Sequence, residues 1–347
     1  MKLVIEQIID SEIIHHYDAG TKITSKCNRI KVEHCGNTNT VSLPLSFFKK
    51  VFNGFRIGRR FLRTDKSVFY PVSDNGQLEA IIGVYQKNIY RIDWPTMNFR
   101  TTGQFRQGRV PLHQSICRTE KGSFFLGEYS LNKKNLPVPV WKSEDKGNSW
   151  KIVFEFSRNQ ARHVHGCFWD PFEKKVWVCT GDLKGECHII CTDEDFKNIE
   201  WLSDGTQVWR ACQLIFKKYY VFWGMDSPLT QSFVCRLDRK TRSLEKMFKL
   251  PGPVWYSKEL EGNWMLFATA VEVGPFVERE YARIFATQDG LNWHEIYKAK
   301  KDRWPIVLFK AGVLAFATGK QNSSCFYFFA EALSGIEGKI LQCRIQS

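Results

Sequence analysis

The chain alternates short apolar runs of four to eight residues with turns rich in Gly, Asp, Asn and Lys. Runs of this length indicate β-strands, because an amphipathic helix needs apolar residues three and four positions apart over a longer stretch. Residues 211–223 show the pattern, with two apolar runs on either side of Lys217 and Lys218. We therefore expect an all-β protein built from hairpins.

The strands recur in units of about 46 residues. Each unit has a second strand that ends at a similar place, namely at Glu128, Asp182, Asp226, Glu272 and Lys320. Four short strands in a repeat of this length indicate the blades of a β-propeller. Units begin near residues 65, 110, 160, 206, 252 and 302. We expect a single propeller of six four-stranded blades, with five or seven as alternatives.

Residues 1–64 fit the repeat poorly, so we expect an N-terminal extension or cap before a propeller domain over residues 65–347. Segments 29–34 and 40–43 could be strands that complete or cap the last blade. Within residues 45–63, aromatic and aliphatic residues recur at helical spacing among six Lys and Arg. This pattern predicts a short basic helix, which either plugs the propeller or contacts an anionic membrane surface.

Composition narrows the choice of partners. Of the 347 residues, 43% are hydrophobic and 14% aromatic, enough for a large core. The net charge of +14 favours an anionic partner: an acidic glycan, an anionic membrane or nucleic acid. Nothing except the net charge favours nucleic acid, so we rank nucleic acid last among these partners. Neither glycine-rich nucleotide-binding motif occurs, which argues against dinucleotide and nucleotide-triphosphate enzymes.

The cysteines and the N-terminus indicate a compartment. Eleven Cys are scattered singly, without a C-x-x-C pair, so neither a zinc ribbon nor a disulfide framework is suggested. Glu6 and Asp10 interrupt the first apolar run, which argues against a signal peptide. No run has the 18 apolar residues of a membrane span. We expect a cytoplasmic protein, peripheral to a membrane if its basic helix binds lipid.

Two turns carry a recognisable motif. Residues Ser143, Asp145, Gly147 and Trp150 match S-x-D-x-G-x-x-W at every specified position, and Thr287 to Trp293 is a copy one residue shorter. Thr192 to Asp195, followed by Trp201, looks like a decayed third copy. In such a turn the polar side chains bond the backbone, Gly adopts the permissive dihedral, and Trp packs between blades.

On these motifs the chain resembles the Asp-box, or bacterial neuraminidase repeat, superfamily of sialidase-like β-propellers over roughly residues 60–347. The resemblance implies sialidases, other glycosidases, lyases or non-catalytic glycan binders as relatives. Phe55-Arg56-Ile57-Gly58 is similar to the Phe/Tyr-Arg-Ile-Pro motif of sialidases, but Gly58 replaces the proline. We therefore do not expect classical sialidase activity, and the motif turns themselves are structural.

Candidate site residues gather at one rim of the predicted propeller. In a four-stranded blade, the loop entering the first strand and the loop leaving the second lie on one face, opposite the motif turns. The acids Glu128, Asp182, Asp226 and Glu272 would share this rim. The starts of the innermost strands would add His113, Arg162, His163, His165, Arg210 and Tyr256.

This set suits chemistry on an acidic sugar. We assign catalysis to His163, His165, Tyr256, Asp226 and Glu272, and substrate binding to Arg162, Arg210, Glu128, Asp182 and His113. Paired carboxyl groups suit hydrolysis, whereas histidines with a tyrosine suit β-elimination from a uronic acid. The spacing of His163 and His165 also suits a divalent metal, which stays open as a cofactor. The competing interpretation is that His113 and the acids have only structural hydrogen bonds.

The sequence thus predicts a carbohydrate-active enzyme, either a hydrolase or a lyase, acting on an acidic glycan or glycolipid intermediate. The alternative is a non-catalytic propeller that binds glycan or protein.

Overall fold

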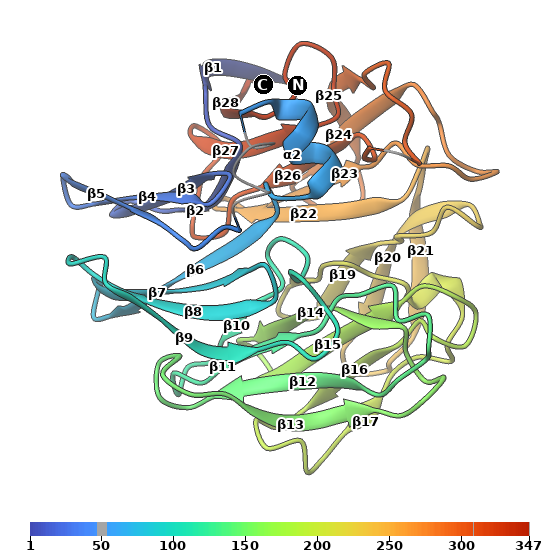
Figure 1. The fold of residues 1–347 in the computed structure, drawn as a ribbon. Coiled ribbons are helices and arrows are strands. Elements are labelled where there is room, and N and C mark those ends of the chain that lie inside the picture. Colours follow the sequence, from blue (N-terminus) through green and yellow to red (C-terminus); the bar gives the residue numbers. More distant parts are fainter. Residues whose placement is uncertain (47–53, 308, 347) are drawn as a thin grey trace.

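The computed structural model describes residues 1–46, 54–307 and 309–346, and these form seven antiparallel four-stranded sheets around a central axis (Figure 1). Each sheet is one blade, and its first strand lies nearest the axis. The prediction of an all-β propeller is confirmed.

The first four blades follow the chain in order. Blade one contains β2 (Ile13–Tyr17), β3 (Thr21–Lys26), β4 (Arg29–His34) and β5 (Asn37–Ser42). Blade two contains β6 (Ser67–Asp74), β7 (Gln77–Tyr85), β8 (Asn88–Asp93) and β9 (Phe99–Gln104). Blade three contains β10 (Cys117–Arg118), β11 (Phe124–Gly127), β12 (Val138–Ser143) and β13 (Lys151–Phe156). Blade four contains β14 (His163–Asp170), β15 (Lys175–Gly181), β16 (Ile189–Thr192) and β17 (Glu200–Trp201).

The remaining blades complete the ring. A 3₁₀ turn, η1 (Gln207–Trp209), precedes blade five, which contains β18 (Ile215–Phe216), β19 (Tyr220–Gly224), β20 (Ser232–Asp238) and β21 (Leu244–Leu250). Blade six contains β22 (Val254–Leu260), β23 (Trp264–Thr269), β24 (Tyr281–Thr287) and β25 (His294–Lys300). Blade seven contains β26 (Val313–Phe316), β27 (Phe326–Glu331), β28 (Lys339–Gln346) and, outermost, β1 (Lys2–Ile9).

The two ends of the chain close the ring in blade seven. Strand β1 pairs antiparallel with β28, from Lys2 opposite Gln346 to Ile9 opposite Ile340. The first strand of the sequence thus completes a sheet whose other three strands come from the last 35 or so residues. Figure 1 shows both termini beside this blade.

The prediction of six blades is wrong, because residues 13–42 form a complete blade. Its inner strands bury Ile14, Ile23 and Val32 fully. Its outer strand β5, however, has no buried residue. Since a strand without a buried face shows no apolar alternation, the repeat pattern missed this blade. Segments 29–34 and 40–43 therefore belong to blade one and do not cap the last blade.

The predicted register of the last blade is also wrong. Lys320 follows β26, which is the first strand of blade seven, and not its second strand. It therefore lies on the opposite face from Glu128 and Asp182. The equivalent position in blade seven is Glu331, at the end of β27.

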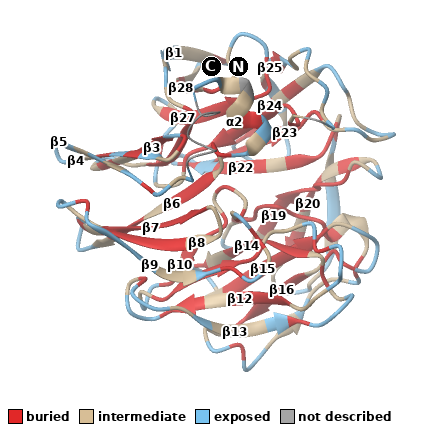
Figure 2. Cartoon of the chain, in the orientation of Figure 1, coloured by how far each residue is buried: buried red, intermediate tan, exposed pale blue. Residues whose placement is uncertain are grey.

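The core lies between successive blades, and burial is greatest in the inner strands (Figure 2). All six residues of β23 are buried, whereas most residues of β25 at the outer edge are exposed or only partly buried. Glycines let neighbouring blades approach closely at the ends of second strands. A Cβ on Gly127 would lie 2.2 Å from Val164 of blade four, and a Cβ on Gly224 would lie 2.5 Å from Val254 of blade six.

The two motif turns join the third and fourth strands of their blades. In blade three, Ser143 donates to Asp145 at 2.8 Å, and Gly147 N–H donates to Ser143 Oγ at 2.8 Å. In blade six, Asp289 accepts the backbone N–H groups of Leu291 and Asn292, both at 2.8 Å.

The tryptophans that end these turns contact the preceding blade. Trp150 donates to Thr102 of blade two at 3.2 Å, and Trp293 stacks on Phe248 of blade five. The decayed third copy differs. Asp193 binds the backbone of that turn, but Trp201 is 40% exposed. Trp150 and Trp293 are half-buried between their blades, and Trp201, although more exposed, still places its ring 6.0 Å from that of Phe156 in blade three.

A seven-residue helix, α2 (Arg56–Leu62), lies over blades seven and one (Figure 1). Its arginines point to acids of the propeller: Arg56 binds Glu12 and Glu337, both at 2.8 Å, and Arg60 binds Asp302 at 2.7 Å. Residues 47–53, which include the predicted helical positions Phe48, Val51 and Phe52, lie outside the described residues. Membrane contact through residues 45–63 stays a prediction, although these arginine charges are paired within the chain.

Two further findings concern membrane-spanning helices and cysteines. Within residues 1–46, 54–307 and 309–346, no helix has the length and apolar character needed to cross a bilayer. All eleven cysteines lie in this part of the chain, and none of them forms a disulfide there. Nine of them are buried, where they pack as small apolar side chains.

Candidate functional site

The candidate site lies on the entry rim, which we define as the face where each first strand begins and each second strand ends. Blade four contributes His163 and His165 from β14 and Asp182 just after β15. Blade five contributes Arg210 just before β18 and Asp226 just after β19. These five residues, named the rim cluster here, contact one another in a continuous chain.

The two histidines and Asp182 converge through three atoms. The Nε2 atoms of His163 and His165 are 3.1 Å apart. Oδ1 of Asp182 lies 3.2 Å from the first and 3.3 Å from the second. The predicted same-face placement of the two histidines is reached through an irregular strand, because the register of β14 against β15 shifts between Val164 and Gly166. Such bulges re-aim side chains next to functional sites.

Backbone carbonyls orient both imidazole rings. His163 Nδ1 lies 2.7 Å from the carbonyl oxygen of Ser130, and His165 Nδ1 lies 3.0 Å from that of Ala211. A carbonyl oxygen can only accept a hydrogen bond, so each Nδ1 carries a proton. The Nε2 atoms are the ones left to face Asp182.

Arg210 links the acids of two blades. Its Nη2 lies 2.9 Å from Oδ1 of Asp182, and its Nε donates to Oδ2 of Asp226 at 3.1 Å. Its Nη1 also donates to the backbone oxygen of Asp182 at 3.2 Å. Burial works to raise the pKa of Asp182, but the two imidazoles and the Arg210 charge hold that pKa well below its usual range. Burial likewise opposes the Arg210 charge, yet Asp226 and Asp182 raise the pKa of this guanidinium.

Glu272, from the loop after β23 in blade six, lies close enough to the rim cluster for the charges of Asp226, Arg210 and Asp182 to act on it. Burial raises its pKa to about 8, with a further contribution from the negative charge of Asp226. Its Oε2 and Oδ1 of Asp226 are buried oxygens without a hydrogen-bond partner. The Glu272 carboxyl is therefore protonated at neutral pH.

Sequence reasoning missed two residues at this site. Tyr129 places its ring 4.1 Å from that of His163, and burial and the Asp182 charge raise the pKa of its phenol. Cys212 lies 3.2 Å from Oδ2 of Asp226, and burial raises the pKa of its thiol. Tyr129 directly follows the repeat-aligned Glu128, and Cys212 follows Arg210 by two positions. Their places in the repeat were therefore the available signal.

Four of the predicted site residues, namely Glu128, Arg162, His113 and Tyr256, have other contacts and lie outside the rim cluster. Glu128 accepts the backbone N–H groups of Arg106, Gln107 and Gly108 at 2.7, 2.8 and 3.1 Å, so it holds the loop before blade three. Arg162 lies 3.4 Å from Glu186 at the edge of the rim. These two residues have structural contacts and do not join the rim cluster.

His113 and Tyr256 lie on the central axis. His113 Nε2 is 2.8 Å from the backbone oxygen of Phe316, and the His113 and Tyr256 rings are 5.9 Å apart. Burial lowers the pKa of His113 to about 4, so its ring is neutral at physiological pH. Together with Gln213, which donates to the His113 backbone oxygen, these side chains fill the middle of the channel.

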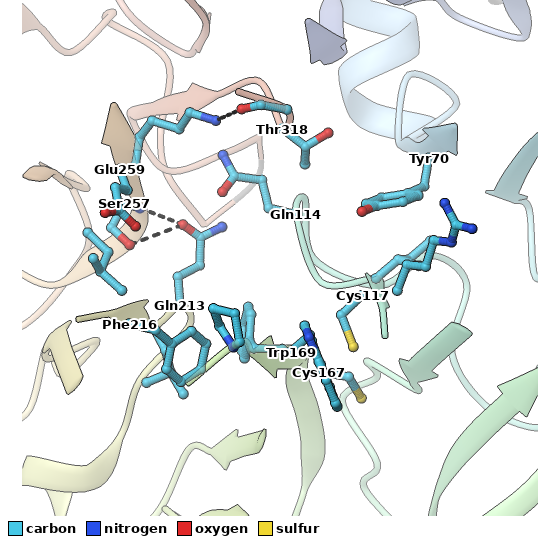
Figure 3. A pocket seen from close by; sticks show the side chains of 18 of the residues that line it. Tyr70, Gln114, Cys117, Cys167, Trp169, Gln213, Phe216, Ser257, Glu259 and Thr318 are labelled. Carbon is cyan, nitrogen blue, oxygen red and sulfur yellow. Dashed lines mark hydrogen bonds between the residues drawn. The ribbon is translucent and has the colours of Figure 1, made fainter. Parts of the chain in front are cut away.

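A separate pocket of about 500 Å³ opens at the opposite end of the axis (Figure 3). Its lining includes Tyr70, Gln114, Trp169, Gln213 and Phe216, which come from four blades. Figure 3 shows the Gln213 side chain hydrogen-bonded to Ser257 of blade six. None of the five rim-cluster residues lines this pocket, so the molecule has two distinct polar regions along its axis.

No protein-family model matches the sequence, and no curated protein matches it. Solved structures do match. YCF48 bound to D1 peptide has a TM-score of 0.58 and 10% identity, and the match covers 99% of this chain and 97% of that one. A chain of the mitotic checkpoint complex has a TM-score of 0.58 and 8% identity, with 99% and 95% covered.

A third match is the extracellular domain of the putative one-component system BT4673 from B. thetaiotaomicron, with a TM-score of 0.59 and 8% identity. It covers the whole of this chain but only 40% of that one. A prolyl endopeptidase structure also matches, at a TM-score of 0.54. At these identities the likeness shows the β-propeller fold alone, which enzymes and non-catalytic proteins share. Membership of the sialidase-like Asp-box family stays a prediction.

Proposed function

We propose that the rim cluster and Glu272 form the active site of a carbohydrate-active enzyme, a hydrolase or lyase that acts on an acidic glycan or glycolipid. The observation that carries this proposal is the convergence of two histidines, one arginine and three acids from three adjacent blades on one rim. Active sites commonly combine a positive anchor with carboxyl groups of separated pKa.

Glu272 is suited to proton donation. Its pKa of about 8 keeps the carboxyl protonated at neutral pH, so it can deliver a proton to the oxygen of a leaving sugar. Asp226 has an unpaired oxygen that can act as the partner base. In hydrolysis, water would add to the sugar carbon as the glycosidic bond breaks, and the proton from Glu272 would complete the leaving hydroxyl.

Arg210 is suited to binding the carboxylate of the substrate. A guanidinium has five N–H groups, and in Arg210 three of them bind Asp182 and Asp226. The remaining two can bind a substrate carboxylate. The net charge of +14 would attract an acidic substrate, and a glycolipid substrate would bring the protein to a membrane surface.

Elimination would use the same rim differently. A base removes the proton next to the carboxylate of a uronic acid, and the glycosidic oxygen leaves with a proton from an acid. His163, whose Nδ1 donates to the Ser130 carbonyl and whose Nε2 carries the lone pair, offers a base for this reaction, and Glu272 an acid.

A second candidate function is ligand binding without turnover, supported by the pocket at the opposite end of the axis. Aromatic side chains beside the amides of Gln114 and Gln213 suit either a sugar or a peptide backbone. YCF48, a propeller of the same size, was solved with a bound peptide.

Turnover of a panel of acidic oligosaccharides and glycolipids, followed by mass spectrometry, tests the proposal. We expect Glu272→Gln to lower the rate by at least about 100-fold, because general acid catalysis contributes that much or more. Glu261→Gln, an exposed acid in the turn between β22 and β23 on the opposite face, is the matched control and should keep the wild-type rate.

Products that gain water would establish a hydrolase, and an unsaturated uronate would establish a lyase. An equal rate for Glu272→Gln and wild type would contradict the proposed site. No turnover, with binding lost in Gln213→Ala, would support the second candidate.

A further inference from the structure

We propose that His163, His165 and Asp182 bind one divalent transition-metal ion. Three potential ligand atoms, two imidazole Nε2 and one carboxylate Oδ1, lie 3.1 to 3.3 Å from one another. The proposal concerns binding alone, so it stands or fails independently of the proposed activity on glycans.

Hydrogen bonding favours a cation at this point. Both Nδ1 atoms donate to backbone carbonyls, which leaves the two Nε2 atoms directed at each other and at a carboxylate oxygen. A single proton on one ring can bridge only one of these contacts. A metal ion would accept all three lone pairs at once. Metal-bound histidines usually donate their other N–H to a carbonyl or carboxylate, as both rings do here.

The spacing of the three atoms fits a metal. With metal–ligand bonds of about 2.1 Å, ligand atoms are about 3.0 Å apart in octahedral sites and about 3.4 Å apart in tetrahedral sites. The observed separations fall within that range. Little rearrangement of the rings would therefore be needed.

Burial differs between the ligands. The side chains of His163 and His165 are almost fully buried, whereas that of Asp182 is 26% exposed. The rigid nitrogen ligands would thus hold the ion from inside, and the open side would leave a position for water or a substrate oxygen. Three protein ligands with one open position are typical of catalytic zinc sites.

The surrounding charges favour a dication. Asp182 and Asp226 are balanced by Arg210 alone within the cluster. Arg210 shares Oδ1 of Asp182 with the proposed ion, and a carboxylate oxygen has lone pairs for both. Two imidazoles and a carboxylate suit Zn²⁺, Mn²⁺ or Fe²⁺ better than Ca²⁺ or Mg²⁺.

A neighbouring set of atoms is the competing site. His165 Nδ1, Cys212 Sγ and an Asp226 oxygen also lie within 4.8 Å of one another. Binding there would require the Nδ1 lone pair, but Nδ1 already donates to the carbonyl of Ala211 at 3.0 Å. The first set is therefore the better site.

Calorimetric titration of the chelator-treated full chain with Zn²⁺ or Mn²⁺ tests the proposal, together with elemental analysis of the dialysed complex. We expect one ion per chain with a micromolar or lower Kd. Asp182→Asn and the double variant His163→Ala/His165→Ala should each weaken binding by more than about 10-fold, since even indirect ligand partners contribute that much. Asp182→Asn preserves the shape of the side chain and covers the case in which the double variant does not fold.

Two control variants sharpen the test. His294→Ala removes an exposed histidine from the outer strand of blade six and should bind like wild type. Cys212→Ala should also bind like wild type. No binding by wild type at 100 μM metal, wild-type affinity in Asp182→Asn, or loss of binding in Cys212→Ala would each overturn the proposed site.

Discussion

At the scale of single residues, the site depends on which atom of each side chain is already engaged. Carbonyl oxygens engage one nitrogen of His163 and of His165, and the other nitrogen of each ring faces Asp182. Gly181 is part of the same geometry, because a Cβ there would lie 2.5 Å from Cε1 of His165. By contrast, the carboxylate of Glu128 accepts hydrogen bonds from the loop before blade three and from the Trp141 indole. Residue type alone therefore does not tell a functional acid from a structural one.

The Glu272 carboxyl should make stability depend on pH. Its pKa is 4.5 as a free side chain and about 8 in the folded protein. Between these values the folded state holds a proton that the unfolded state has released, so stability falls as the pH rises from about 5 to about 8. Glu272→Gln replaces this carboxyl group with an amide that does not ionise. The Tm of wild type should therefore fall over that pH range, and the Tm of Glu272→Gln should fall by at least about 2 °C less.

Differential scanning calorimetry in chelator at several pH values measures this difference. Glu261→Gln should follow the wild-type curve. Parallel curves for wild type and Glu272→Gln would show that Glu272 ionises normally in the folded protein.

At the scale of elements, α2 shows how a basic segment can be part of the propeller. The helix lies with its arginines against acids from the loops of blades seven, one and two. Phe55 and Phe61, in contrast, are 76% and 65% exposed. A helix that plugged the channel would turn its aromatic residues inward and its arginines outward. In α2 the arginines face the propeller, and Phe55 and Phe61 face the solvent.

Arg60 should be the residue that anchors this helix. It is almost fully buried, binds Asp302, and lies over the ring of Phe309 at 5.5 Å. We expect Arg60→Ala to lower the free energy of unfolding by about 1 to 3 kcal/mol, through loss of the ion pair and of packing. Urea unfolding followed by tryptophan fluorescence measures the change.

Phe61→Ala in the same helix is the control, and its free energy of unfolding should stay within about 0.5 kcal/mol of wild type because the side chain is exposed. A larger effect for Phe61→Ala than for Arg60→Ala would mean that the exposed face of the helix, and not its arginine face, stabilises the protein.

At the scale of the whole molecule, ring closure by β1 joins the two ends of the chain in one sheet. Such a closed ring leaves only short, protected sheet edges. Because every blade packs on its two neighbours, opening the ring at one blade would expose apolar surface on blades six, seven and one.

Deletion of residues 1–10 should therefore destabilise the protein strongly. It removes the whole of β1 and leaves β28 as an unpaired edge. We expect a lower Tm and concentration-dependent association, measured by calorimetry and size-exclusion chromatography. Glu6→Gln, which removes only the exposed ion pair between Glu6 and Arg344, should leave both measurements unchanged. A monomeric deletion variant with wild-type Tm would show that blade seven is stable with three strands.

Local patterns were enough to predict the propeller, most strands of blades two to six and the placement of several acids at one rim. Apolar periodicity and turn residues act over a few positions, so they can be read along the chain. They also placed His163, His165, Asp182, Arg210, Asp226 and Glu272 on the face where the structure brings them together. The same patterns failed at β5, whose exposed strand has no apolar period, and at Lys320, where a first strand resembled a second.

Only the tertiary structure decided the partners of these side chains. Arg210 reaches an acid of the preceding blade, and His113 meets the carbonyl of Phe316, 203 residues away. Contacts between blades depend on how many blades close the ring and on how each loop folds over the rim. Neither property is encoded in the spacing of residues within one repeat. The repeat could therefore indicate where a site would form, but blade packing selected the residues that form it.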